Sequence, residues 1–159
     1  MPSVNMEEIV LQRGAHAGGP ESGGCLMEWV SYMAGESWSD HPVCVSPLIA
    51  AFLRQWQDDL DGERRQKLKP YAARVIGTAA SKEIEEQRAW MLCDWMVRVH
   101  TPAWLDLAGL AEQATAIRDL PAITSASAAR GAMPTLEKAQ ERSAAAWSLN
   151  LRGCSRTPV

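Results

Sequence analysis

Long apolar runs are absent from this sequence: the longest unbroken one, residues 48–53, is far shorter than a membrane-spanning helix. Such a helix needs about 20 consecutive apolar residues, so we expect no membrane segment. The first ten residues contain Glu7 and Glu8 and lack the basic start of a secretory signal peptide. A cytoplasmic location is therefore predicted.

Positive charge is also scarce, because 16 Lys and Arg residues stand against 19 Asp and Glu residues, for a net charge of −3. A protein that binds duplex DNA needs a basic face. A basic run, Arg64–Lys69, directly follows the acidic stretch 58–63, and such a run is typical of a solvated helix surface of mixed sign. Duplex DNA is therefore not an expected partner.

Alternation of polar and apolar residues, the pattern of a half-buried strand, is nearly absent, whereas apolar residues recur at helical spacing. The hydrophobic content of 47% and the charged content of 22% are those of a globular protein. The four cysteines are expected to be reduced thiols, since disulfide frameworks belong to secreted domains. These observations predict an all-α fold, a compact bundle of about five to six helices with an irregular Gly-rich N-terminal arm.

Helix-breaking and flexible residues divide the chain into predicted segments. These are an N-terminal arm and Gly-rich loop at 1–24, a helical core domain at 25–118, a flexible connector at 119–134, a C-terminal helix at 135–151 and a disordered tail at 152–159. We expect the C-terminal helix to be an appendage that docks through Trp147 and is dispensable for folding.

Within the core domain, the helix expected at 82–99 is apolar on two sides, which is typical of a central helix. Asp94 and Arg98 stand four residues apart on it, in the favourable order for an ion pair. Ser46 and Pro47 combine a good N-cap with a good first helical residue, and they predict a helix start.

Tryptophan is abundant: the chain has seven, against one Phe and two Tyr. Trp38 is the one most clearly outside a helical stripe, and it lies in the polar loop 36–45. An exposed aromatic anchor is the usual energetic centre of an interface. The first hypothesis is therefore a non-enzymatic module that binds an unidentified protein partner through Trp38, Glu36, Asp40 and His41. The many Trp residues in so small a chain also favour a homodimer.

The second hypothesis is a metalloprotein, because residues 16–44 concentrate side chains with metal-ligand chemistry. A zinc ion would be bound by His16, Cys25, His41 and Cys44, whose side chains are typical zinc ligands. The spacing of the four does not match a zinc-finger pattern, and only His41 and Cys44 form a close pair.

A thiol-dependent enzyme is a further alternative, with Cys25 as its nucleophile. The position of Cys25 at a helix start would lower the pKa of its thiol. His41 would then act as the base, and Asp40 or Glu36 would orient it.

A purely structural interpretation assigns these residues no chemistry. Cys25 and Cys44 would be small buried hydrophobes. Glu28, on the first helix, would pair with an arginine such as Arg54 or Arg98.

Several short motifs also give the chain a family resemblance. They are Gly23-Gly24-Cys25-Leu26-Met27-Glu28-Trp29, Ala34-Gly35-Glu36, Ser39-Asp40-His41-Pro42 with Ser46-Pro47, Arg88-Ala89-Trp90 and Thr101-Pro102-Ala103-Trp104-Leu105. On these motifs, residues 14–110 resemble a family of short uncharacterised proteins of actinobacteria and their phages. No known activity is attached to that family, so the resemblance implies no site residue. It favours an accessory role in a phage or mobile element.

Overall fold

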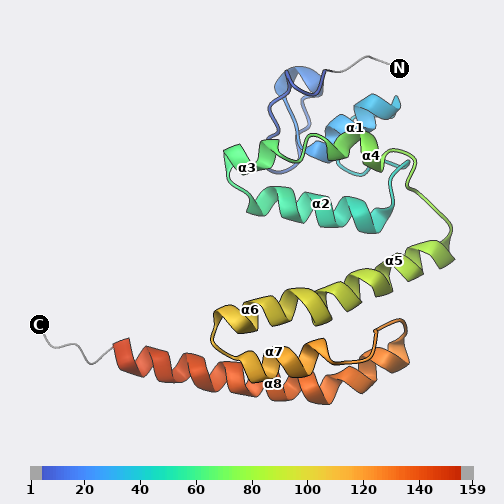
Figure 1. Cartoon of the computed structure of the whole chain (residues 1–159). Coiled ribbons are helices and arrows are strands. Elements are labelled where there is room, and N and C mark those ends of the chain that lie inside the picture. Colours follow the sequence, from blue (N-terminus) through green and yellow to red (C-terminus); the bar gives the residue numbers. More distant parts are fainter. Residues whose placement is uncertain (1–4, 155–159) are drawn as a thin grey trace, which may run out of the picture. The chain divides into compact units, whose positions relative to one another are not determined.

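The computed structural model describes the backbone of residues 5–154 and the side chains of residues 5–146. Within that part of the chain every named element is a helix, and the one β-type pairing is an isolated bridge between Leu11 and Gly24 (Figure 1). The prediction of an all-α fold is confirmed. The elements are α1 (Leu26–Ala34), α2 (Pro47–Asp59), α3 (Gly62–Gln66), α4 (Tyr71–Val75), α5 (Lys82–Trp95), α6 (Thr101–Leu107), α7 (Ala111–Arg118) and α8 (Ala126–Cys154), with the short turns η1 (Pro20–Ser22) and η2 (Met96–His100).

The chain divides into two compact units, Met1–Glu85 and Glu86–Val159. The boundary falls inside α5, whereas the sequence predicted one core domain over 25–118. The prediction that α5 is a central helix is wrong: none of its residues is buried, and Met91 and Trp95 are 71% and 43% exposed. A helix with two apolar sides becomes central only when other helices cover both of them.

In the first unit, helix α1 is fixed at both ends by local chemistry. The backbone N–H of Cys25, the N-cap, donates to the side chain of Glu28 at 2.7 Å. The helix ends at Gly35, whose φ of 76° is a left-handed conformation that glycine adopts without strain. Residues 26–31 are all buried, and α1 packs against α2 and α4.

The predicted start of α2 is confirmed, because the Ser46 hydroxyl accepts the Ile49 N–H at 3.4 Å and Pro47 is the first helical residue. The N-terminal arm joins the same unit through Leu11, whose N–H and C=O both bond to the side chain of Gln66, at 2.8 and 3.0 Å. The arm is therefore part of the core. The large buried apolar side chains of this unit are Ile9, Leu11, Leu26, Met27, Trp29, Val30, Val45, Leu53, Leu68 and Val75.

In the second unit, α5, η2 and α6 follow one another without a break, because Trp95, His100 and Thr101 all keep right-handed helical dihedrals. Helix α6 packs against α7, and α7 packs against α8 (Figure 1). The buried apolar cluster of this unit contains Leu105, Ala114, Ile117 and Ala139, and Ile123 and Ala132 are buried as well.

The predicted ion pair between Asp94 and Arg98 is confirmed, with N–O distances of 2.7 and 3.0 Å. Asp94 also accepts the backbone N–H of Ile123 at 2.8 Å. The pair therefore holds the loop that precedes α8 as well as its own helix.

The C-terminal boundaries differ from those expected. Helix α8 begins at Ala126, inside the predicted connector 119–134, continues through Pro134 and ends at Cys154, inside the predicted tail. Alanine is the strongest helix former, so a stretch rich in Ala is helical once one side of it is buried. Ala132 and Ala139 supply that side. The side chain of Trp147 and residues 155–159 of the predicted tail lie outside the described residues.

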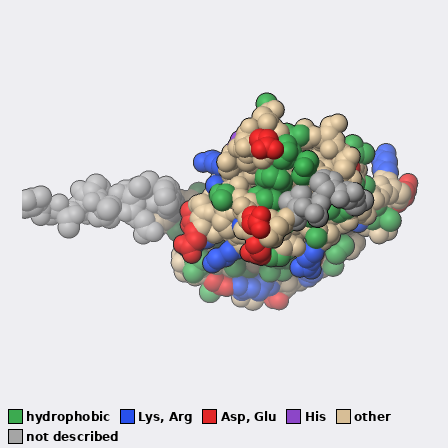
Figure 2. Space-filling model, turned by 90° about the horizontal axis from the view of Figure 1, so that it is seen from above, with side chains coloured by type: hydrophobic (Ala, Val, Ile, Leu, Met, Phe, Trp, Pro, Cys, Tyr) green, Lys and Arg blue, Asp and Glu red, His purple; other side chains and the backbone are tan. Residues whose placement is uncertain are grey.

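Among residues 5–154, no helix has both the length and the apolar character that crossing a membrane requires. On the face drawn in Figure 2, acidic and basic side chains are both scattered among hydrophobic ones.

Candidate functional site

The residues that the sequence placed in a chemical cluster surround a buried carboxylate, that of Glu28. Its oxygens accept hydrogen bonds from the backbone N–H groups of His16 and Cys25, and Oε2 lies 3.0 Å from Nδ1 of the His16 ring. The expected pairing of Glu28 with Arg54 or Arg98 is wrong. Glu28 instead clamps the Gly-rich loop to the start of α1, which is a structural task.

Cys25 lies beside this carboxylate and is buried. Burial raises the pKa of its thiol to about 12, and the negative charge of Glu28 acts in the same direction. The expectation of a lowered thiol pKa is wrong, because burial and the neighbouring carboxylate outweigh the helix start. Cys25 therefore lacks the thiolate character that a nucleophile needs near neutral pH.

Glu36 and Cys44 form a second local arrangement, in the loop before α2. The carboxylate of Glu36 accepts the N–H groups of Val43 and Cys44 at 2.6 and 2.8 Å. Partial burial works in the opposite direction, but bonds from the Cys44 thiol and from these N–H groups lower the pKa of Glu36. Burial and the bond to Glu36 raise the pKa of the Cys44 thiol. Glu36 therefore holds the loop closed.

His41 is exposed, and its Nδ1 lies 2.6 Å from Oδ1 of Asp40. Arg54 donates to the Asp40 carbonyl at 2.8 Å, and its Nε lies 3.9 Å from Oδ2. The proposed base and its orienting carboxylate are thus brought together. The structure describes no bond from either of them to Cys25.

The four proposed zinc ligands have different partners: Glu28 for His16 and Cys25, Asp40 for His41 and Glu36 for Cys44. Among the described side chains, no three His, Cys, Asp or Glu residues gather in a way that would hold a metal ion.

Trp38 is not the exposed anchor that the sequence predicted. Its ring packs edge-on against Trp29 and Tyr32, with centroid separations of 5.2 and 6.3 Å. Its indole N–H donates to the His16 carbonyl at 2.7 Å. A Cβ atom at Gly24 would lie 2.5 Å from the Trp38 ring, so this ring occupies the space that glycine leaves. The polar residues that flank Trp38 indicated an exposed loop, but the loop folds back onto α1.

A pocket of about 390 Å³ lies in the same unit, between the loop and α2. Its walls are mostly Pro, Val and Ala side chains, and its charged lining residues include Arg54 and Glu85. Arg54 already binds Asp40, and Glu85 accepts the hydroxyl of Ser46. The polar groups that would orient a small ligand are therefore engaged within the protein.

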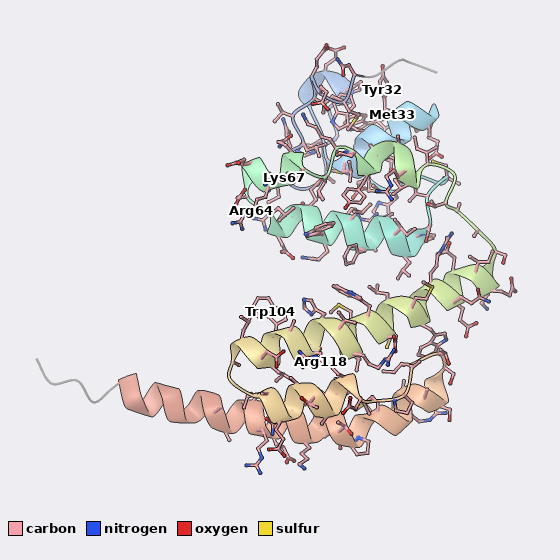
Figure 3. All side chains as sticks on the ribbon, viewed as in Figure 1. Tyr32, Met33, Arg64, Lys67, Trp104 and Arg118 are labelled. Atoms are coloured by element: carbon pink, nitrogen blue, oxygen red, sulfur yellow. The ribbon has the colours of Figure 1, made fainter. Side chains whose placement is uncertain are left out.

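The sequence interpretation missed a group of exposed apolar side chains on the continuous helix formed by α5, η2 and α6. This group, which we call the α5–α6 face, consists of Met91, Trp95, Met96, Val99, Trp104 and Leu107, each between 41% and 79% exposed. In Figure 3 the Trp104 side chain projects from the side of α6 that faces away from α7. The sequence signal for this face was the apolar pattern on two sides of the helix expected at 82–99. That pattern was interpreted as the mark of a buried, central helix.

His100 links the two Trp rings of this face. Its ring centroid lies 5.3 Å from that of Trp95 and 6.1 Å from that of Trp104, and the Trp104 indole N–H donates to His100 Nε2 at 3.0 Å. Because an indole N–H can only donate, the imidazole carries its proton on Nδ1. These contacts hold three rings side by side at the surface.

The backbone beneath the three rings is unusual, because η2 is a single π-helical turn. The backbone N–H of Thr101 donates to the Met96 carbonyl, and its hydroxyl bonds the same oxygen at 2.8 Å. Such turns occur mostly within α-helices and frequently at functional sites. The α5–α6 face is therefore the candidate functional site.

No protein-family model, no curated protein and no solved structure matches the chain. Function is therefore inferred from the chemistry and geometry of its own residues.

Proposed function

We propose that this protein is a non-enzymatic protein-binding module whose docking surface is the α5–α6 face. The observation that carries the proposal is the exposure of Trp104, which is 62% accessible and whose ring is fixed by a hydrogen bond to His100. Tryptophan is the side chain most enriched among residues that dominate binding energy. A ring that is already held in place loses little conformational entropy when a partner covers it.

The composition of the α5–α6 face fits the centre of an interface. Such centres are enriched in aromatic residues and Met and depleted of charged residues. All six members of this face are apolar, and two are Trp and two are Met. Asp94 and Arg98, which belong to the same continuous helix, bind each other, so this pair needs no new partner on docking.

The enzymatic and metal-binding alternatives have weaker support. The thiol mechanism needs a thiolate at Cys25, and the pKa of that thiol is raised to about 12. The zinc proposal needs His16, Cys25, His41 and Cys44 to converge, and these residues bond to three different carboxylates. Docking through the α5–α6 face requires neither an ionised thiol nor a movement of these side chains. The resemblance to actinobacterial and phage proteins adds the proposal of an accessory role in the cytoplasm.

The proposed function is tested by comparing proteins retained from an extract of cells that encode the chain. The bait is the parent chain, a Trp104→Ser variant or a Met133→Ser variant. Met133 is a matched control because it is an exposed apolar residue of α8, outside the α5–α6 face. We expect the parent and the Met133→Ser chain to retain the same proteins and the Trp104→Ser chain to lose them. Equal retention by all three would overturn the proposal.

A further inference from the structure

We infer that the occupant of the α5–α6 face is a second copy of this chain, so that the protein forms a two-fold symmetric dimer with antiparallel α5–α6 helices. This inference rests on the proposed function and names its partner. It follows from the order of the side chains along the face and from the area that they expose.

The order of the large side chains is nearly the same from either end of the face. Trp95 and Trp104 stand at equal distances from the midpoint between Val99 and His100. In an antiparallel pair with its two-fold axis at this midpoint, Trp95 of one copy lies beside Trp104 of the other. A two-fold interface uses the same patch on both subunits and must be complementary to itself. The α5–α6 face has that property.

The residues at the two ends of the face, Met91 and Leu107, are also nearly equidistant from this midpoint. Met91 stands eight residues before Val99, and Leu107 stands seven residues after His100. At a rise of about 1.5 Å per residue, this mismatch of one residue is small beside the reach of either side chain. The two-fold pairing therefore brings Met91 of one copy near Leu107 of the other, while Met96 of one copy lies beside the small side chain of Ala103 of the other.

The exposed area is close to what a dimer interface requires. If the roughly 150–250 Å² that a large aromatic side chain buries is taken as an upper guide for all six residues, their exposed fractions correspond to at most roughly 500–900 Å². The largest apolar patch on a typical monomer is about 300–600 Å², and a standard interface buries about 800 Å² on each partner. The area of the α5–α6 face thus lies between that of the largest patch on a typical monomer and that of one side of a standard dimer interface.

The first experiment measures the mass of the full chain in solution by sedimentation equilibrium over a range of concentrations. We expect the parent chain and a Met133→Lys control to form dimers. Val99→Lys places two ammonium groups beside the two-fold axis, so we expect its dissociation constant to rise at least about 30-fold. Val99 is exposed, and unchanged far-ultraviolet circular dichroism would verify that the variant folds. A parent chain that is monomeric throughout would overturn the inference, as would a Val99→Lys chain that dimerises normally.

The second experiment tests the register with two complementary variants, Trp95→Lys and Trp104→Glu. A mixed dimer of the two retains one Trp95–Trp104 contact and gains one Lys–Glu contact, whereas each homodimer has lost both Trp–Trp contacts. Native mass spectrometry of the mixture should therefore show more mixed dimer than either homodimer. A statistical distribution of the three species would overturn the antiparallel register.

The dimer and the proposed function fail in different ways. A monomeric parent chain that still retains other proteins through Trp104 would overturn the dimer and leave the binding function intact. Loss of both dimerisation and Trp104-dependent retention would overturn the two together.

Discussion

Trp104 donates its indole N–H to Nε2 of His100, one helical turn earlier, at a distance of 3.0 Å. Residues four positions apart lie on the same side of a helix, so this bond is local to the surface of α6 and η2. The His100 ring lies in turn against Trp95. One histidine therefore fixes the orientation of both Trp rings of the α5–α6 face, although it belongs to neither the core nor an ion pair.

His100→Phe should weaken association and leave folding unchanged. Phe keeps an aromatic ring between the two Trp side chains but cannot accept the Trp104 N–H. A hydrogen bond of this kind contributes about 0.5–1.5 kcal/mol, so we expect the dissociation constant of the dimer to rise about 2- to 10-fold. The measurement is sedimentation equilibrium, with His41→Phe, a change at an exposed histidine of the other unit, as the control. Equal effects of the two substitutions would contradict the role assigned to His100.

Trp38→Ala should destabilise the protein. The substitution removes the edge contacts with Trp29 and Tyr32 and leaves the His16 carbonyl without its donor. We expect a loss of about 2–4 kcal/mol in the free energy of unfolding, measured by urea denaturation. Trp38→Phe retains most of the ring contact and should cost about 1–2 kcal/mol. An unchanged unfolding midpoint for Trp38→Ala would contradict the packing of Trp38 against Trp29 and Tyr32 and would support its predicted exposure.

Cys25 should resist alkylation in the folded protein. Its thiol pKa is raised to about 12 by burial, so iodoacetamide at about pH 8 should modify it only after denaturation. Peptide mass mapping of native and denatured samples makes the comparison. Rapid modification of Cys25 in the native protein would restore the thiol-enzyme hypothesis.

The same raised pKa makes stability depend on pH on the alkaline side. The folded thiol stays protonated above the ordinary value of 9.0, while the unfolded thiol ionises there. Its contribution is therefore complete below pH 9.0 and is lost as the pH rises from 9.0 towards about 12. The urea midpoint of the parent chain should consequently fall more between about pH 8 and pH 10 than that of Cys25→Ala. Parallel falls would show that Cys25 does not contribute.

Asp94 should stabilise the second unit only above its own titration range. The bond from Arg98 and the N–H of Ile123 lower the pKa of Asp94 against a smaller opposing effect of burial. A carboxylate with a lowered folded pKa stabilises the protein above its unfolded pKa of about 3.9, and this contribution is lost as the pH falls through the folded pKa. The thermal midpoint of Asp94→Asn should therefore lie below that of the parent near neutral pH, and the difference should shrink as the pH falls below the unfolded pKa and through the lowered folded pKa. A constant difference between the two midpoints would contradict this account.

Local features of the fold could be predicted from the sequence, since their causes lie within a few residues. Ser46 caps α2 through an N–H three residues away, and Asp94 binds Arg98 across one helical turn. Gly35 ends α1 because its own φ is positive. In each case the cause of the local structure lies within the same short sequence motif.

The partners of the residues in the predicted cluster at 16–44 could not be predicted, because they depend on contacts between distant segments. Glu28 binds His16 across the Gly-rich loop, and Trp38 reaches back to the same residue, so neither partner can be inferred from local spacing. The exposure of Trp95 and Trp104 depends on which helices cover α5 and α6. An apolar pattern indicates only that burial of a helix surface is favourable. It does not distinguish burial in the protein core from burial in an interface.

Truncation after Arg118 should unfold the second unit, contrary to the dispensable C-terminal helix that the sequence predicted. Helix α8 contributes the buried residue Ala139 to the core that contains Leu105 and Ile117. The truncation also removes the Ile123 N–H that Asp94 accepts. The second unit packs α6, α7 and α8 together. Without α8, too little apolar area stays buried to offset the entropy lost in ordering α6 and α7.

Hydrogen exchange of the truncated chain makes this prediction specific to each unit. Amides of α1 and α2 should remain protected, because their core lies within Met1–Glu85, whereas amides of α6 and α7 should exchange rapidly. A chain that ends at Ala146 retains Ala132 and Ala139 and should keep the protection of both units. If α6 and α7 remain protected after truncation at Arg118, the two helices form a stable core without α8, and the contribution assigned to Ala139 is wrong.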